Sequence, residues 1–178
     1  MGKIFAGYIF IFFHLKINEW DILADFIGYI LVYLGISRFS DDAGAFKRAR
    51  PWTAAMAVVT FLLPFFPLIF PDFSVTAMYI LNLLMIGVSL YILYRIDTGI
   101  GQLEQKNGLL LMSDRLLTLW KVQVLLVAAN WCFSWPAIDA FLLLAGFFAI
   151  AAAISNIVFL FFLYQVKKEL DAGKAGGA

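Results

Sequence analysis

The sequence predicts an all-α integral membrane protein, a bundle of six helical segments with a short first segment and both termini in the cytoplasm. Of its 178 residues, 63% are hydrophobic and 14% charged, and the mean hydropathy is +0.91, values outside the range of soluble domains. Several uncharged runs approach the ~20 residues that a helix needs to cross a bilayer. Basic residues gather in alternate connections between these runs, which predicts their orientation.

The chain is short for so many segments. Six spans of ~20 residues each would use about two thirds of it, so we expect one transmembrane domain over residues 1–170 and a flexible tail over 171–178. The single cysteine, Cys132, excludes an internal disulfide and a multi-thiolate metal site. A net charge of +1 argues against nucleic acid as a partner.

The first segment, Ile4 to Leu15, is short for a membrane span. It would rise only ~18 Å, against a hydrocarbon core of ~30 Å. It is apolar on all sides, follows Lys3 and precedes no small-residue cleavage site, so we expect it to insert rather than to act as a signal peptide or surface helix. Whether it spans fully stays open.

Five further segments complete the predicted bundle. The second, Ile22 to Phe39, is short, but Arg38 near its end can extend its side chain to the membrane surface. Charge or proline bounds each of the other four: Trp52 to Phe70, Val75 to Tyr94, Leu116 to Phe133 and Ile138 to Tyr164.

The connections alternate between charged and short ones. The charged set comprises residues 37–51, residues 95–115 and the tail from Lys167, and we expect it in the cytoplasm of a bacterium, next to the plasma membrane. All basic residues except Lys16 then lie on that side. The stretch Arg95 to Arg115 mixes leucines with polar residues, which predicts a surface helix or an extension of the following span. It is a candidate docking point for a membrane or cytoplasmic protein.

Prolines crowd the outer part of the third segment. Pro64, Pro67 and Pro71 each remove a backbone donor and clash with the preceding turn, so we expect a bend or break near residues 60–63. Freed carbonyls at membrane depth must be buried in protein or line a wet cavity, and broken helices mark binding sites in transporters. Prolines near the end of a span are also harmless, and both interpretations stay open.

Polar residues inside the later segments are the main candidates for a ligand site. Unsatisfied amides facing lipid are costly, so we expect them to point inward. They line a ligand cavity or bond neighbouring helices together; the candidates are Asn82, Gln123, Asn130 and Asn156. On the second segment, Gly28 and Gly35 share a face and would let another backbone approach closely.

A second candidate site combines His14, Asp21 and Asp25 with Glu19. Asp21 and Asp25 are four residues apart and share a helix face, so the cluster could bind a divalent cation or carry protons. The alternative is that the aspartates cap and stabilise the start of a helix. No catalytic motif is present, so we expect neither an enzyme nor a cofactor.

The N-terminal region carries one family resemblance. Residues 21–29 read Asp-Ile-Leu-Ala-Asp-Phe-Ile-Gly-Tyr. This segment resembles small uncharacterised bacterial multi-span membrane proteins in which an Asp-Ile-Leu-Pro-Asp-Phe-Ile-Gly-Tyr-like stretch follows a short apolar run. Ala24 stands where those proteins have proline. The resemblance implies a multi-pass membrane protein and brings no activity with it.

Two functions remain as hypotheses. The first is a small-molecule binding or transport component whose cavity the four amides line. The alternative is a non-catalytic accessory subunit whose amides only hold helices together and whose basic loops bind a partner.

Overall fold

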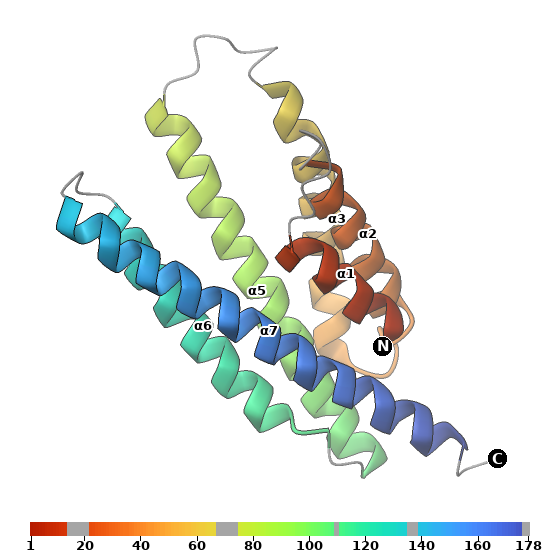
Figure 1. The fold of residues 1–178 in the computed structure, drawn as a ribbon. Coiled ribbons are helices and arrows are strands. Elements are labelled where there is room, and N and C mark those ends of the chain that lie inside the picture. Colours follow the sequence, from red (N-terminus) through yellow and green to blue (C-terminus); the bar gives the residue numbers. More distant parts are fainter. Residues whose placement is uncertain (14–21, 67–74, 109–110, 135–138, 176–178) are drawn as a thin grey trace.

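The computed structural model describes residues 1–13, 22–66, 75–108, 111–134 and 139–175. Every regular element within those ranges is helical, which confirms the all-α prediction. In chain order the helices are α1 (Gly2–Phe13), α2 (Ile22–Ser37), α3 (Gly44–Leu62), the short 3-10 helix η1 (Leu63–Phe65), α5 (Val75–Asn107), α6 (Ser113–Ser134) and α7 (Asp139–Ala175) (Figure 1).

Three helices are long and apolar enough to cross a membrane. Their spanning ranges are Thr76–Asn107 in α5, Ser113–Phe133 in α6 and Leu143–Ala172 in α7. The helices α1 and α2 are apolar but shorter. Large apolar side chains lie exposed along α7, and Leu143 is 80% exposed. Exposed apolar surface on this scale is unfavourable in water, so it indicates a membrane location.

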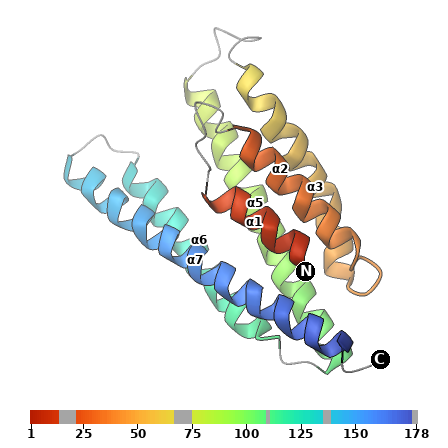
Figure 2. The ribbon, with the colours of Figure 1, turned by 45° about the vertical axis from the view of Figure 1, so that its right-hand side comes forward.

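The helices pack as a series that closes on itself. Along the chain α1 packs on α2, α2 on α3, α3 on α5, α5 on α6 and α6 on α7, and α7 also contacts α1. The α6–α7 hairpin lies beside the group formed by α1, α2 and α3, with α5 between them (Figures 1 and 2).

Glycines allow α1 and α2 to pack at close range. A Cβ atom on Gly7 would lie 2.6 Å from the carbonyl oxygen of Gly28, and one on Gly28 would lie 2.8 Å from the carbonyl oxygen of Gly7. A Cβ on Gly35 would overlap Ile4. The close partner predicted for Gly28 and Gly35 is therefore α1 of the same chain. Such small-residue contacts favour helix association in lipid, where burial of apolar surface contributes little to the stability of a helix pair.

The expectation for residues 95–115 was wrong over most of that stretch. Residues 95–107 extend the preceding helix, α5, and only residues 113–115 lengthen α6. The apolar residues Ile96, Ile100 and Leu103 are buried and carry the apolar face of α5 past Arg95. Gly108, with φ +64°, follows the helix in the left-handed conformation that glycine adopts most readily.

Two other boundaries differ from the sequence prediction. The helix α3 begins at Gly44 and carries Pro51 internally, and its α-helical geometry ends at Leu62. The 3-10 turn that follows contains Pro64, within reach of the predicted break, whereas Pro67 lies outside the described residues. At the other end of the chain α7 continues to Ala175, so residues 171–175 of the predicted flexible tail are helical.

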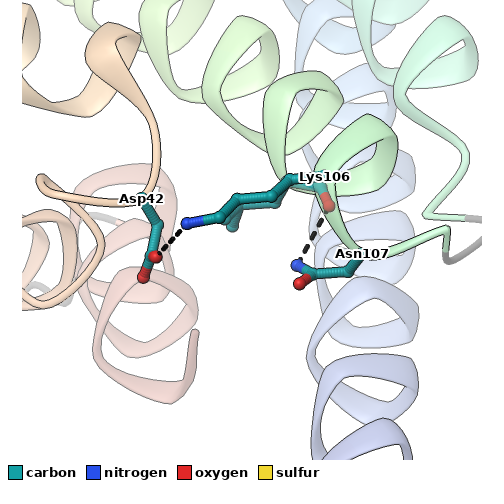
Figure 3. A network of polar contacts seen from close by, with 4 residues as sticks. Asp42, Lys106 and Asn107 are labelled. Atoms are coloured by element: carbon teal, nitrogen blue, oxygen red, sulfur yellow. Dashed lines mark hydrogen bonds and ion pairs between the residues drawn. The ribbon is translucent and has the colours of Figure 1, made fainter.

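Charged connections gather at one end of the molecule. The start of α1, the α2–α3 connection, the end of α5 and the end of α7 all lie there (Figures 1 and 2). Lys106 Nζ and Asp42 Oδ1 form an ion pair of 2.6 Å between α5 and the α2–α3 connection (Figure 3). The backbone N–H of Ser113 donates to Glu104 Oε2 at 3.1 Å. We refer to this region as the charged end.

Candidate functional site

A cleft of about 310 Å³ opens between α1, α5, α6 and α7. Its volume lies at the lower end of the range of small-molecule sites. Four of its side chains carry neutral polar groups: Tyr8, Ser89, Gln123 and Asn156. The remaining lining is apolar and consists of Ile11, Phe12, Ile86, Leu90, Leu93, Val127 and Ala152. The cleft therefore suits an uncharged molecule with a small number of hydrogen-bonding groups.

Helical spacing explains why these residues meet. Gln123 and Val127 on α6, like Ala152 and Asn156 on α7, are four residues apart and share a helix face. The fourth wall comes from Tyr8 in the C-terminal half of the short helix α1. The cleft thus lies where the α6–α7 hairpin meets the rest of the bundle.

The two amides of the cleft bond to each other. Gln123 Nε2 donates to Asn156 Oδ1 at 3.0 Å, and Gln123 is only 4% exposed. This bond joins α6 to α7 and uses one N–H of Gln123 and the carbonyl of Asn156. A carboxamide has further donors and acceptors, so the pair can both hold the hairpin together and bind a ligand.

Two tyrosines place hydroxyl groups beside the cleft. The Tyr29 hydroxyl donates to Ser89 Oγ at 3.1 Å, which joins α2 to α5. Tyr8 is buried and lines the cleft from α1. Sequence reasoning did not select Tyr8. The available signal was a tyrosine in the middle of an apolar segment, because a buried tyrosine hydroxyl generally has a polar neighbour.

The structure places Gln123 and Asn156 in this cleft and the other two candidate amides elsewhere. Asn130 Nδ2 donates to the carbonyl oxygen of Ala145 at 3.0 Å, so it links α6 to the backbone of α7. Asn82 is exposed and lines a separate cleft of about 370 Å³ beside Leu63 of η1. Asn82 and Ser89 share a face of α5, but seven residues separate them by ~10.5 Å along the axis. One helix face therefore contributes to two clefts.

The predicted metal or proton cluster is described only in part. His14 and Asp21 lie outside the described residues. Asp25 lies in the first turn of α2, where a carboxylate interacts favourably with the positive end of the helix dipole. Within the described ranges, no three His, Cys, Asp or Glu side chains come close enough together to hold a metal ion.

A buried acid, Asp97 on α5, was not among the candidate site residues predicted from the sequence. Its exposed fraction is 0%, and neither carboxyl oxygen has a hydrogen-bond partner among the described residues. The sequence places Asp97 two residues after Arg95, in a stretch interpreted as a solvated connection. The signal that was available is the apolar spacing of Leu93, Ile96 and Ile100 around it, which is typical of a helix face that continues into the core.

Comparison of the chain with protein-family models, with curated proteins and with solved structures found no match.

Proposed function

We propose that this protein is a polytopic bacterial inner-membrane protein that binds or transports a small uncharged molecule in the cleft between α1, α5, α6 and α7. The observation that carries the proposal is the cleft itself. It places Tyr8, Ser89, Gln123 and Asn156 around an apolar volume of about 310 Å³. Ligand sites in helical bundles form between helices in this way, with an apolar lining and few polar groups.

The proposed topology places six segments in the membrane with the charged end in the cytoplasm. Lys and Arg residues are enriched in cytoplasmic connections, and the charged connections gather at one end of the molecule. On this topology α1 crosses only part of the bilayer alone and is held by its glycine contacts with α2. The cleft then lies at membrane depth, because its α5 residues, 86–93, lie near the middle of that helix.

Cleft-filling substitutions test this proposal. Ala152 lines the cleft, whereas Ala153 on the same helix is exposed. Phenylalanine at position 152 would occupy part of the ligand volume, and phenylalanine at position 153 would extend into lipid. The full-length wild-type protein and the Ala152→Phe and Ala153→Phe variants are gently solubilised and purified, and their bound small molecules are identified by mass spectrometry.

We expect one compound to accompany wild type and Ala153→Phe in near-stoichiometric amount and to be lost from Ala152→Phe. The compound should be uncharged and largely apolar, because none of the described residues that line the cleft is charged. Equal retention of every compound by the two variants would remove the cleft as the binding site.

The accessory-subunit function has its own supporting observation. Gln123 bonds Asn156, and Asn130 bonds the backbone of α7, so three of the four amides already connect helices. A partner protein retained in stoichiometric amount, and lost when Lys47 and Arg48 of the charged end are both changed to glutamate, would favour this alternative. Both side chains are exposed.

A further inference from the structure

Asp97 is a buried acid without a structural partner in the described part of the chain. It is fully buried within α5, and neither carboxyl oxygen accepts or donates a hydrogen bond there. An ionised carboxylate in such a place is strongly disfavoured unless a cation balances it. Ionisable groups inside membrane bundles mark ion or proton pathways for this reason.

Four basic residues on the surrounding helices have other contacts. On α3 and α5, Arg50 and Arg95 each bond a tyrosine hydroxyl, at 3.3 and 2.9 Å. On α6 and α7, Arg115 and Lys167 lie over aromatic rings. The titratable group that does lie within electrostatic range of Asp97 is Tyr8 of α1, which also interacts with Tyr29 of α2.

The surroundings of Asp97 suit a proton better than a metal cation. Calcium takes 6–8 oxygen ligands, and magnesium demands six in octahedral geometry. The carboxyl group of Asp97 supplies only two oxygens, and the buried neighbours Ile96 and Ile100 on α5 are apolar. A proton needs only one carboxyl oxygen.

One face of α5 connects the buried acid to the cleft. Tyr8 of α1 also lines the cleft and interacts electrostatically with Asp97. On α5, Ser89 and Leu93 line the cleft and precede Asp97 by eight and four residues, so the three side chains follow one face of the helix. Asp97 therefore lies one to two turns beyond the cleft, towards the charged end.

We propose that Asp97 is a proton-binding site whose occupancy is coupled to the occupancy of the cleft, an inference that rests on the proposed function. When a proton arrives from water, an O–H bond forms on one carboxyl oxygen and the negative charge disappears. The reverse step returns the proton to water. Because Ser89 and Leu93 line the cleft on the same face of α5, the charge on Asp97 alters the electrostatic field in which a ligand binds. Ligand and proton then influence each other's affinity reciprocally.

Infrared spectroscopy of the full-length protein in lipid tests this coupling without a known ligand. The C=O band of a protonated carboxyl is followed across a pH series in wild type, Asp97→Asn and Asp41→Asn. The substitution at the exposed Asp41 is the matched control, because it removes the same chemical group from a solvated site. In Ala152→Phe the added ring fills part of the cleft permanently. Ala153→Phe adds the same ring outside the cleft and is the matched control. Elution as a folded, monodisperse species is required of every variant.

We expect one titrating band to vanish in Asp97→Asn and to remain in Asp41→Asn. We also expect Ala152→Phe to move the titration midpoint of that band by about half a pH unit or more, a roughly threefold change in proton affinity, and Ala153→Phe to leave it in place. Absence of a band assignable to Asp97, or equal midpoints in the two phenylalanine variants, would overturn the inference. If a compound is retained in the mass-spectrometric comparison but the Asp97 midpoint is the same in the two phenylalanine variants, this inference alone is overturned. Failure to retain any compound would instead overturn the proposed function.

Discussion

A methyl group added at Gly7 would test the close contact between α1 and α2. In the structure, a Cβ on Gly7 would lie 2.6 Å from the Gly28 carbonyl oxygen, 2.6 Å from Val32 Cγ2 and 2.9 Å from the Val32 backbone nitrogen. Two of these three atoms belong to the backbone and cannot rotate away. Gly7→Ala therefore forces the two helices apart, whereas Gly87→Ala on α5 meets nothing within 4 Å.

The expected effect follows from two opposing terms. Alanine stabilises a helix interior by about 1 kcal/mol relative to glycine, and this gain applies to both substitutions. Overpacking costs about 1–3 kcal/mol, and the backbone clash at Gly7 places it near the upper limit. Gly7→Ala should then lower the free energy of unfolding by about 2 kcal/mol, and Gly87→Ala should raise it by up to about 1 kcal/mol.

Thermal unfolding in detergent micelles measures the difference. For a chain of this size, 1 kcal/mol corresponds to roughly 2–4 °C, so Gly7→Ala should unfold roughly 4–8 °C below wild type. A Gly7→Ala variant that unfolds at or above the wild-type temperature would show that α1 does not pack on α2 at the distance described, and the account of how the short first segment is held would fail.

Three further predictions concern contacts elsewhere in the bundle. A double-mutant cycle of Gln123→Leu and Asn156→Leu should give a coupling energy of about 0.6–1.7 kcal/mol, and a value near zero would show that the amides do not bond. Phe46→Ala should destabilise the protein by about 3–5 kcal/mol in chemical unfolding, because the ring is fully buried; a loss under ~1 kcal/mol would contradict its place in the core. Asp42→Ala and Lys106→Ala should each lower the free energy of unfolding by less than about 1 kcal/mol, because the two side chains are 48% and 54% exposed. Added salt should remove most of that loss. A loss that does not depend on salt would mean that the ion pair is shielded from water.

Helix positions can be predicted from the sequence where the lipid surroundings require a long run of apolar residues. Long apolar runs bounded by charge predict spanning helices, because each backbone polar group must be bonded within its own segment. The start of α5 at Val75 and the core of α6 agree with this expectation. The extension of α5 past Tyr94 was not predicted, because the charged residue Arg95 indicated the end of the spanning helix. Its guanidinium lies over the rings of Tyr91 and Tyr94, so the charge is accommodated without ending the helix.

The candidate site was predictable only in part. Inward-facing amides could be expected from the cost of burying them unpaired, and Gln123 and Asn156 do meet. Asn82 lies in a different cleft from these two amides. Which residues meet depends on how neighbouring helices are placed relative to one another, and residue spacing within one helix does not reveal that placement. Tyr8 of α1 and Ser89 of α5 line the same cleft, and no local pattern relates residues so distant in the chain.

Accessibility of the charged end in intact cells tests most directly the claim that this chain crosses the membrane with that end in the cytoplasm. A single cysteine is introduced by Asp41→Cys, in a Cys132→Ser background because Cys132 is itself exposed. Asp72 follows the predicted segment Trp52 to Phe70 in one of the short connections, so Asp72→Cys serves as the opposite-side control. A membrane-impermeant maleimide is applied to intact and permeabilised cells. The account predicts that the cysteine at position 72 reacts in intact cells and the one at position 41 reacts only after permeabilisation. Reaction at position 41 in intact cells would contradict it.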